Sequence, residues 1–188
     1  MCRRAEAAAC LGVNLVNIRL YQGRSGEVLP LLRDAVAAHP QIPTYRAVLA
    51  LCTAEAGALD AADDHLRHFA ANELRRLPHD TNRMLALAVL AHTAAILEAV
   101  DVAPLLRKEL APFTGQWVVL NCYGGGGAVW GPVDHALARL AQLEQDPLAD
   151  IWFERAATQA TGAPMVLERI GADRAATQRR RPANRAAS

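Results

Sequence analysis

Two glycines that stand 34 residues apart, Gly23 and Gly57, constrain the fold of this chain more than any other feature. A period of this length is typical of arrays in which each repeat is one pair of antiparallel helices. The neighbouring positions keep their apolar character at the same offset, as the pairs Leu15 and Leu49, Val28 and Ala62, Leu32 and Leu66, and Ala35 and Phe69 show. The sequence therefore predicts an all-α fold, a right-handed solenoid of about four helical hairpins.

The spacing within each repeat has a packing explanation. The glycine permits the positive φ that ends the first helix of a hairpin. A small or apolar residue shortly after it lets the second helix approach the first closely, and a bulky residue one turn later fills the groove between them. This reasoning gives a packing signature that consists of Gly23, Val28, Leu32, Gly57, Ala62, Leu66, Ala149 and Phe153.

Helical periodicity and proline breakers give the expected boundaries of the hairpins. The predicted helix pairs are 5–22 with 27–38, 44–56 with 60–72, 80–97 with 102–110, and 132–143 with 148–161, followed by a capping helix over 165–176. The third and fourth turns carry Glu98 and Glu144 in place of glycine. Residues 114–131 form an irregular segment, in which Gly124–Gly127 is expected to be a flexible turn.

Composition agrees with a helical chain of the cytoplasm. Of the 188 residues, 52% are hydrophobic but only 5% are aromatic, and the net charge of +1 indicates neither nucleic acid nor membrane as a partner. The cysteines do not form a CxxC pair, so we expect reduced thiols that pack as small apolar side chains. The longest apolar stretch, 84–97, is too short to span a bilayer.

The C-terminal residues have a different composition from the rest of the chain. From residue 174 onward there are five arginines, at positions 174, 179, 180, 181 and 185, with no acidic residue and almost no bulky apolar one. Such a segment cannot bury enough apolar surface to fold. The expected organisation is a helical repeat domain over 1–173 and a disordered basic tail over 174–188, which binds nucleic acid at most weakly and without sequence specificity.

Several short segments resemble a known family. Leu20-Tyr21-Gln22-Gly23-Arg24, Gly131-Pro132-Val133-Asp134 and Trp152-Phe153-Glu154-Arg155-Ala156 look like the tetratricopeptide-like region of large bacterial regulators, in which an ATPase is joined to a nucleotide cyclase or to a LuxR-type DNA-binding domain. The resemblance covers about residues 11–170 and rests on packing positions. It implies a regulatory helical-repeat module, here without an ATPase, cyclase or helix-turn-helix domain in the sequence.

The sequence does not contain a recognisable catalytic motif. Gly124–Gly127 lacks the Lys-Ser or Lys-Thr of a phosphate-binding loop, and a Gly-x-Ser-x-Gly nucleophile elbow is missing. We therefore expect no enzymatic activity, no catalytic residues, no cofactor and no metal. His65 and His68 could share one helix face but have no evident third ligand, so they are interpreted as part of a solvated face.

The two other notable histidines have structural interpretations. His92 lies within an apolar helix and is interpreted as a hydrogen-bonded core residue. His135 follows Asp134 in the first turn of a helix, where the acid suits the positive end of the helix dipole. The functional alternative lies in the glycine-rich segment, where Trp117, Tyr123 and Trp130 could line a groove for a partner peptide or a small ligand.

The favoured function is a protein-interaction or regulatory module of a bacterial signalling or transcription-regulator family, because a solenoid of hairpins offers an extended surface to a protein partner or a neighbouring regulator domain. The alternatives are a small-ligand-sensing regulatory domain and a degenerate remnant of a cyclase or ATPase regulator.

Overall fold

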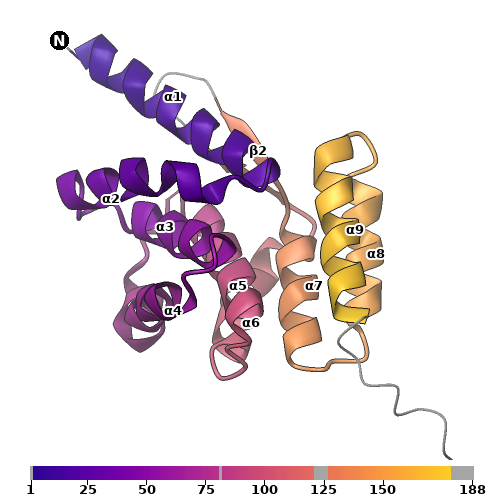
Figure 1. Cartoon of the computed structure of the whole chain (residues 1–188). Helices are drawn as coiled ribbons and strands as arrows, with labels where there is room; N and C mark the ends of the chain where they lie inside the picture. The colour runs from indigo at the N-terminus through magenta and orange to yellow at the C-terminus, as the bar shows by residue number, and fades with distance from the viewer. Residues whose placement is uncertain (1, 81, 121–126, 179–188) are drawn as a thin grey trace, which may run out of the picture.

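The computed structural model describes residues 2–80, 82–120 and 127–178 of the chain. Within these ranges the chain is mostly helical, as predicted, with a single small sheet (Figure 1). The elements are α1 (Cys2–Tyr21), α2 (Leu29–Ala38), α3 (Pro43–Glu55), α4 (Leu59–His68), α5 (Arg83–Leu97), α6 (Ala103–Leu110), β1 (Trp117–Leu120), β2 (Ala128–Pro132), α7 (Val133–Leu143), α8 (Ala149–Gln159) and α9 (Pro164–Gln178). Short 3₁₀ or π turns occupy Ser25–Val28, Phe69–Glu73, Leu74–Arg76 and Ala111–Phe113.

Four helix pairs are joined by the same kind of turn. The residue that ends the first helix of each pair has a left-handed backbone, with φ of 66° at Gly23, 85° at Gly57, 55° at Glu98 and 58° at Gln145. The next amide then donates to the carbonyl five positions earlier, as in Arg24 to Arg19 (2.8 Å), Ala58 to Thr53 (3.1 Å), Ala99 to Ala94 (3.0 Å) and Asp146 to Ala141 (2.8 Å). This pattern is the Schellman motif.

The repeat pattern within the sequence placed three of these four turns at the correct residue. Gly23, Gly57 and Glu98 are the left-handed residues themselves, although Glu98 must bear the steric cost that a side chain adds at positive φ. In the fourth turn the prediction is wrong by one position, because Glu144 has a right-handed backbone with φ of −79° and the chain reverses at Gln145.

The helices pack in sequence order. Helix α3 packs against α2, α4 and α5; α5 packs against α6 and α7; and α7 packs against α6 and α8. The central helices α3, α5 and α7 are therefore buried on several sides, and most of the apolar core comes from them. The side chains of the packing signature are all buried, namely Val28, Leu32, Ala62, Leu66, Ala149 and Phe153.

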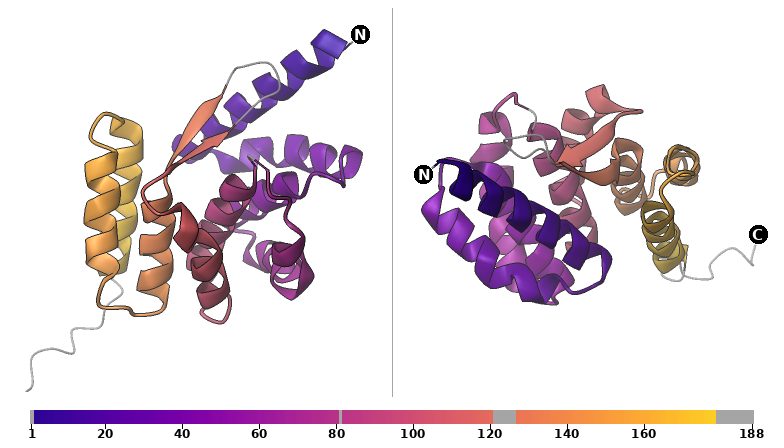
Figure 2. Two further views of the ribbon diagram at one scale, coloured as in Figure 1. Left: turned by 180° about the vertical axis from the view of Figure 1, so that it is seen from behind. Right: turned by 90° about the horizontal axis from the view of Figure 1, so that it is seen from above.

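The segment expected to be irregular contains a small antiparallel sheet. Strand β1 pairs with β2, with a bulge between Val118 and Val119, and the pair lies beside α1 and α5 (Figure 2). A run of four apolar residues is too short to be assigned from periodicity, so the sequence did not reveal it. Gly131 is required here, because its φ is 148° and an added Cβ would come within 3.3 Å of the Val166 side chain.

Helix α9 extends beyond the predicted start of the basic tail. Its helical residues continue to Gln178, and the Arg174 guanidinium lies 3.1 Å from Asp150 and 3.3 Å from Glu154 of α8. Residues 179–188 lie outside the described residues, so the disorder expected there stays a prediction.

Candidate functional site

Three helices bring two histidines and a carboxylate together in the interior. His92 comes from α5, His135 from α7 and Asp173 from α9, and the two imidazoles are only 1% and 4% exposed. The Nε2 atom of His135 lies 2.9 Å from Oδ2 of Asp173, and Nδ1 of His92 lies 4.0 Å from the same oxygen. All three side-chain atoms lie within 4.8 Å of one another. We call these three residues the His-His-Asp cluster.

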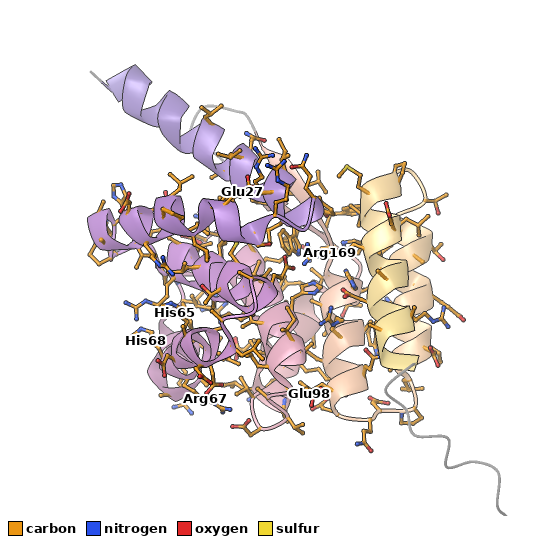
Figure 3. The ribbon with its side chains drawn as sticks, viewed as in Figure 1. Glu27, His65, Arg67, His68, Glu98 and Arg169 are labelled. Carbon is orange, nitrogen blue, oxygen red and sulfur yellow. The ribbon has the colours of Figure 1, made fainter. Side chains whose placement is uncertain are left out.

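Two arginines flank the His-His-Asp cluster. Arg139, one turn after His135 on α7, pairs with the other carboxylate oxygen of Asp173. Arg169, one turn before Asp173 on α9, pairs with Glu55 of α3 at 2.6 Å. Figure 3 shows Arg169 pointing from α9 toward the N-terminal helices. Helix α9 is thus attached to the rest of the molecule by partly buried ion pairs as well as by apolar contacts.

The Arg169–Glu55 pair is itself enclosed by polar and aromatic groups. The Ser25 hydroxyl donates to Glu55 at 2.7 Å, and the Arg169 guanidinium lies 4.8 Å from the centre of the Trp130 ring. Tyr21 donates to the backbone carbonyl of Trp130. A cation over an aromatic face and an ion pair in the same place compensate part of the desolvation of the guanidinium.

The electrostatic environment sets the protonation of the cluster. Burial lowers the pKa of His92 well below its usual value, and burial also lowers the pKa of His135, although Asp173 opposes this. Burial alone would raise the pKa of Asp173, but His135 and Arg139 bring it well below its usual range. At neutral pH the cluster therefore combines two neutral imidazoles with an ionised carboxylate.

A separate apolar groove lies among the N-terminal helices. It has a volume of about 250 Å³ and is lined by α1, α2 and α3, with contributions from α5 and β1. Its walls and floor include Val13, Val16, Leu32, Val48, Leu85 and Leu120. One large apolar side chain that lines it, Leu31 of α2, is 41% exposed to solvent.

The residues that the sequence suggested as a partner groove occupy different environments. Trp130 is 5% exposed and lies under Arg169, Trp117 is half-buried on β1, and Tyr123 lies outside the described residues. Neither tryptophan lines the apolar groove of α1, α2 and α3. A partner groove at these three residues therefore stays a prediction.

The other histidine pair lies on the outer side of α4. Figure 3 shows His65 and His68 there, and within the described part of the chain they belong to no group of three potential metal ligands. From the sequence, His92 and His135 were interpreted separately, so their convergence in the interior was not predicted. The available signal was weak: His135 with Arg139, and Arg169 with Asp173, each place two ionisable groups four residues apart on one helix face.

Cys52 of α3 lies near the same polar interior and should be chemically inert in the folded protein. Burial, reinforced by the nearby Glu55 carboxylate, raises the pKa of its thiol to about 12. At about pH 8, where an ordinary thiol reacts readily, we expect iodoacetamide to leave Cys52 unmodified until urea unfolds the chain. Peptide mass spectrometry checks this, and modification of Cys52 at the same rate with and without urea would contradict it.

Comparison of the chain with models of known protein families, with curated proteins and with solved structures finds no match. None of the described helices combines the length and the apolar character that crossing a membrane requires.

Proposed function

We propose that this protein is a protein-interaction module, a tetratricopeptide-like array of helical hairpins that binds an amphipathic helix of a partner protein in the groove among α1, α2 and α3. The partner is a separate regulatory protein or a neighbouring domain of a bacterial signalling or transcription regulator.

The repeated turn supports the array interpretation. Four hairpins reverse through the same left-handed turn, and α3, α5 and α7, which are the first helices of successive pairs, pack side by side. In such arrays each unit contacts its neighbours, and the exposed faces of the helices are free for binding. The arrangement thus favours a binding scaffold over a closed catalytic pocket.

The apolar groove is the observation that carries the proposal. Single exposed apolar side chains are normal on protein surfaces, but contiguous ones indicate an interaction site. Here Leu31 of α2 lines the groove and is 41% exposed, and the groove is itself mainly aliphatic. Water in contact with this surface would be released when a partner covers it.

The dimensions favour a helix as the occupant. A volume of about 250 Å³ accommodates a few aliphatic side chains but not a whole helix. An amphipathic helix that lies along α1 and α2 would insert residues spaced at i, i+3 or i+4, and i+7 and would leave its polar face in water. The exposed Leu31 side chain would then contact one flank of the bound helix.

Selection of binding peptides tests this proposal. The full chain would be screened against a displayed library of helical peptides of random sequence, and we expect the selected peptides to share three apolar residues with helical spacing. Leu31→Glu, at a residue that lines the groove, should weaken binding of the selected peptide at least tenfold, because a carboxylate in the covered interface loses its hydration. Isothermal titration calorimetry measures the change.

Matched controls are available elsewhere on the surface. Leu59 and Val100 are 47% and 53% exposed and lie outside the groove, so Leu59→Glu and Val100→Glu should change the affinity less than twofold. Equal weakening by the control substitutions, or selected peptides without a common apolar spacing, would refute the groove as the binding site.

A further inference from the structure

We propose that His92, His135 and Asp173 bind a divalent transition-metal ion, with Zn²⁺ the best match, and that this ion fastens α9 to α5 and α7. The site is separate from the apolar groove, so it does not depend on the interaction proposed above.

The donor set fits Zn²⁺. Imidazole nitrogens and a carboxylate oxygen are ordinary zinc ligands, and a set of two histidines with one carboxylate leaves a fourth position for water. The three ligand atoms converge from three helices and lie within 4.8 Å of one another, as one shared ion requires. Hard ions such as Mg²⁺ prefer sites built from oxygen alone.

The hydrogen bonding of the two imidazoles is incomplete without such an ion. Among the described residues, Nδ1 of His92 and Nε2 of His135 are buried and find no hydrogen-bond partner of acceptable geometry. The His135 atom lies 2.9 Å from Oδ2 of Asp173, a contact that is an ion pair only when the imidazole is protonated. A buried polar atom without a partner costs about 1–3 kcal/mol, and one shared ion would satisfy both nitrogens.

The distances require only a modest closure of the cluster. Bonds of about 2.0–2.2 Å to one zinc ion place ligand atoms a little over 3 Å apart in a tetrahedral site. The His135–Asp173 separation of 2.9 Å already meets this, whereas His92, at 4.0 Å from Asp173, must move closer.

The surroundings resemble the outer shell of a metal site. Arg139 pairs with Oδ1 of Asp173, which fixes the carboxylate and leaves Oδ2 facing the two histidines. The second nearby cation, Arg169, is already paired with Glu55, which reduces its repulsion of a metal ion. Since Asp173 is the only member of the cluster on α9, metal binding would couple directly to the docking of that helix.

Metal binding by the full chain provides the test. After treatment with a chelator and removal of the chelator, the protein would be titrated with Zn²⁺, and metal content would be measured by mass spectrometry. We expect one tightly held Zn²⁺ per chain, a rise in Tm on zinc addition, and visible absorption bands of low-coordinate Co²⁺ when cobalt replaces zinc. X-ray absorption of the zinc-loaded chain should show two imidazoles and oxygen ligands at about 2.0–2.1 Å.

Substitutions locate the ion. His92→Gln and Asp173→Asn should each weaken zinc binding by more than about 100-fold, which exceeds the usual effect of an outer-shell change. The matched control is the double change His65→Gln with His68→Gln, which removes the two histidines of α4 and should leave the affinity within twofold.

Two results would overturn the site. The first is a wild-type chain that retains no stoichiometric zinc, or whose bound zinc shows no imidazole ligands, as expected if water alone fills the cluster. The second is zinc binding that disappears with the α4 pair but survives Asp173→Asn. The wild-type stoichiometry and X-ray absorption decide the matter even if a cluster variant fails to fold.

Discussion

Asp134→Ala should lower the free energy of unfolding by about 3–5 kcal/mol, the largest effect that we expect from a single polar residue. The carboxylate is fully buried in the first turn of α7. It accepts hydrogen bonds from the Gly115 amide at 2.8 Å and from the Gln159 side chain at 3.0 Å. Each hydrogen bond to a charged group contributes about 1.5–3 kcal/mol, and alanine would leave both donors unsatisfied.

Asp134 has this importance because it joins three parts of the chain. Its partners lie in the turn before β1 and on α8, and Arg155 of α8 lies 3.1 Å away with a half-exposed side chain. The Arg155 pair is screened by water and adds little. Loss of the two buried hydrogen bonds should therefore account for most of the change.

Asp150 provides a matched control for this prediction. It occupies the first turn of α8, so it has the same favourable relation to a helix dipole, but its side chain is 49% exposed. Asp150→Ala should cost less than about 1 kcal/mol. Urea unfolding followed by circular dichroism measures both variants, and similar losses would show that the dipole and not the buried hydrogen bonds explains Asp134.

Leu66→Ala in the second hairpin should cost about 2–5 kcal/mol, and Ala62→Asp should prevent stable folding. Leu66 is 1% exposed and Ala62 is fully buried where α4 packs on its neighbours. The first change leaves a cavity that the surrounding helices fill only in part. The second places an unpaired carboxylate in a space that admits only a methyl group.

Arg67, which follows Leu66 in the sequence but lies on the outer face of α4, serves as the control. Its side chain is 45% exposed and pairs with Asp63 and Asp101, so Arg67→Ala should cost no more than about 1 kcal/mol. Urea melts of the three variants would be compared with wild type. If Leu66→Ala unfolds at the same urea concentration as Arg67→Ala, the packing register derived from Gly23 and Gly57 is wrong.

Much of the helical architecture could be predicted from the sequence because its causes are local. A glycine that adopts positive φ, a proline that ends a helix and an apolar face with helical spacing all act within a few residues. The 34-residue offset between Gly23 and Gly57 therefore located the first two hairpins, and the apolar stretch that became α5 was assigned as a helix buried on several sides. The turns at Glu98 and Gln145 were harder, because there the left-handed backbone is adopted by a residue with a side chain and not by a glycine.

Only the tertiary structure determined which polar groups meet. His92, His135 and Asp173 stand 43 and 38 residues apart along the chain, and each alone is an ordinary residue of a helix. The sequence did not reveal the sheet either, because short strands are stabilised by pairing with a partner strand and by packing against helices, and neither is a local property. Local sequence therefore determined where this chain turns and which helix faces it buries. Long-range packing decided that two histidines, a carboxylate and two arginines lie close together. The physical reason is that the distances between these groups depend on how α9 docks on α5 and α7.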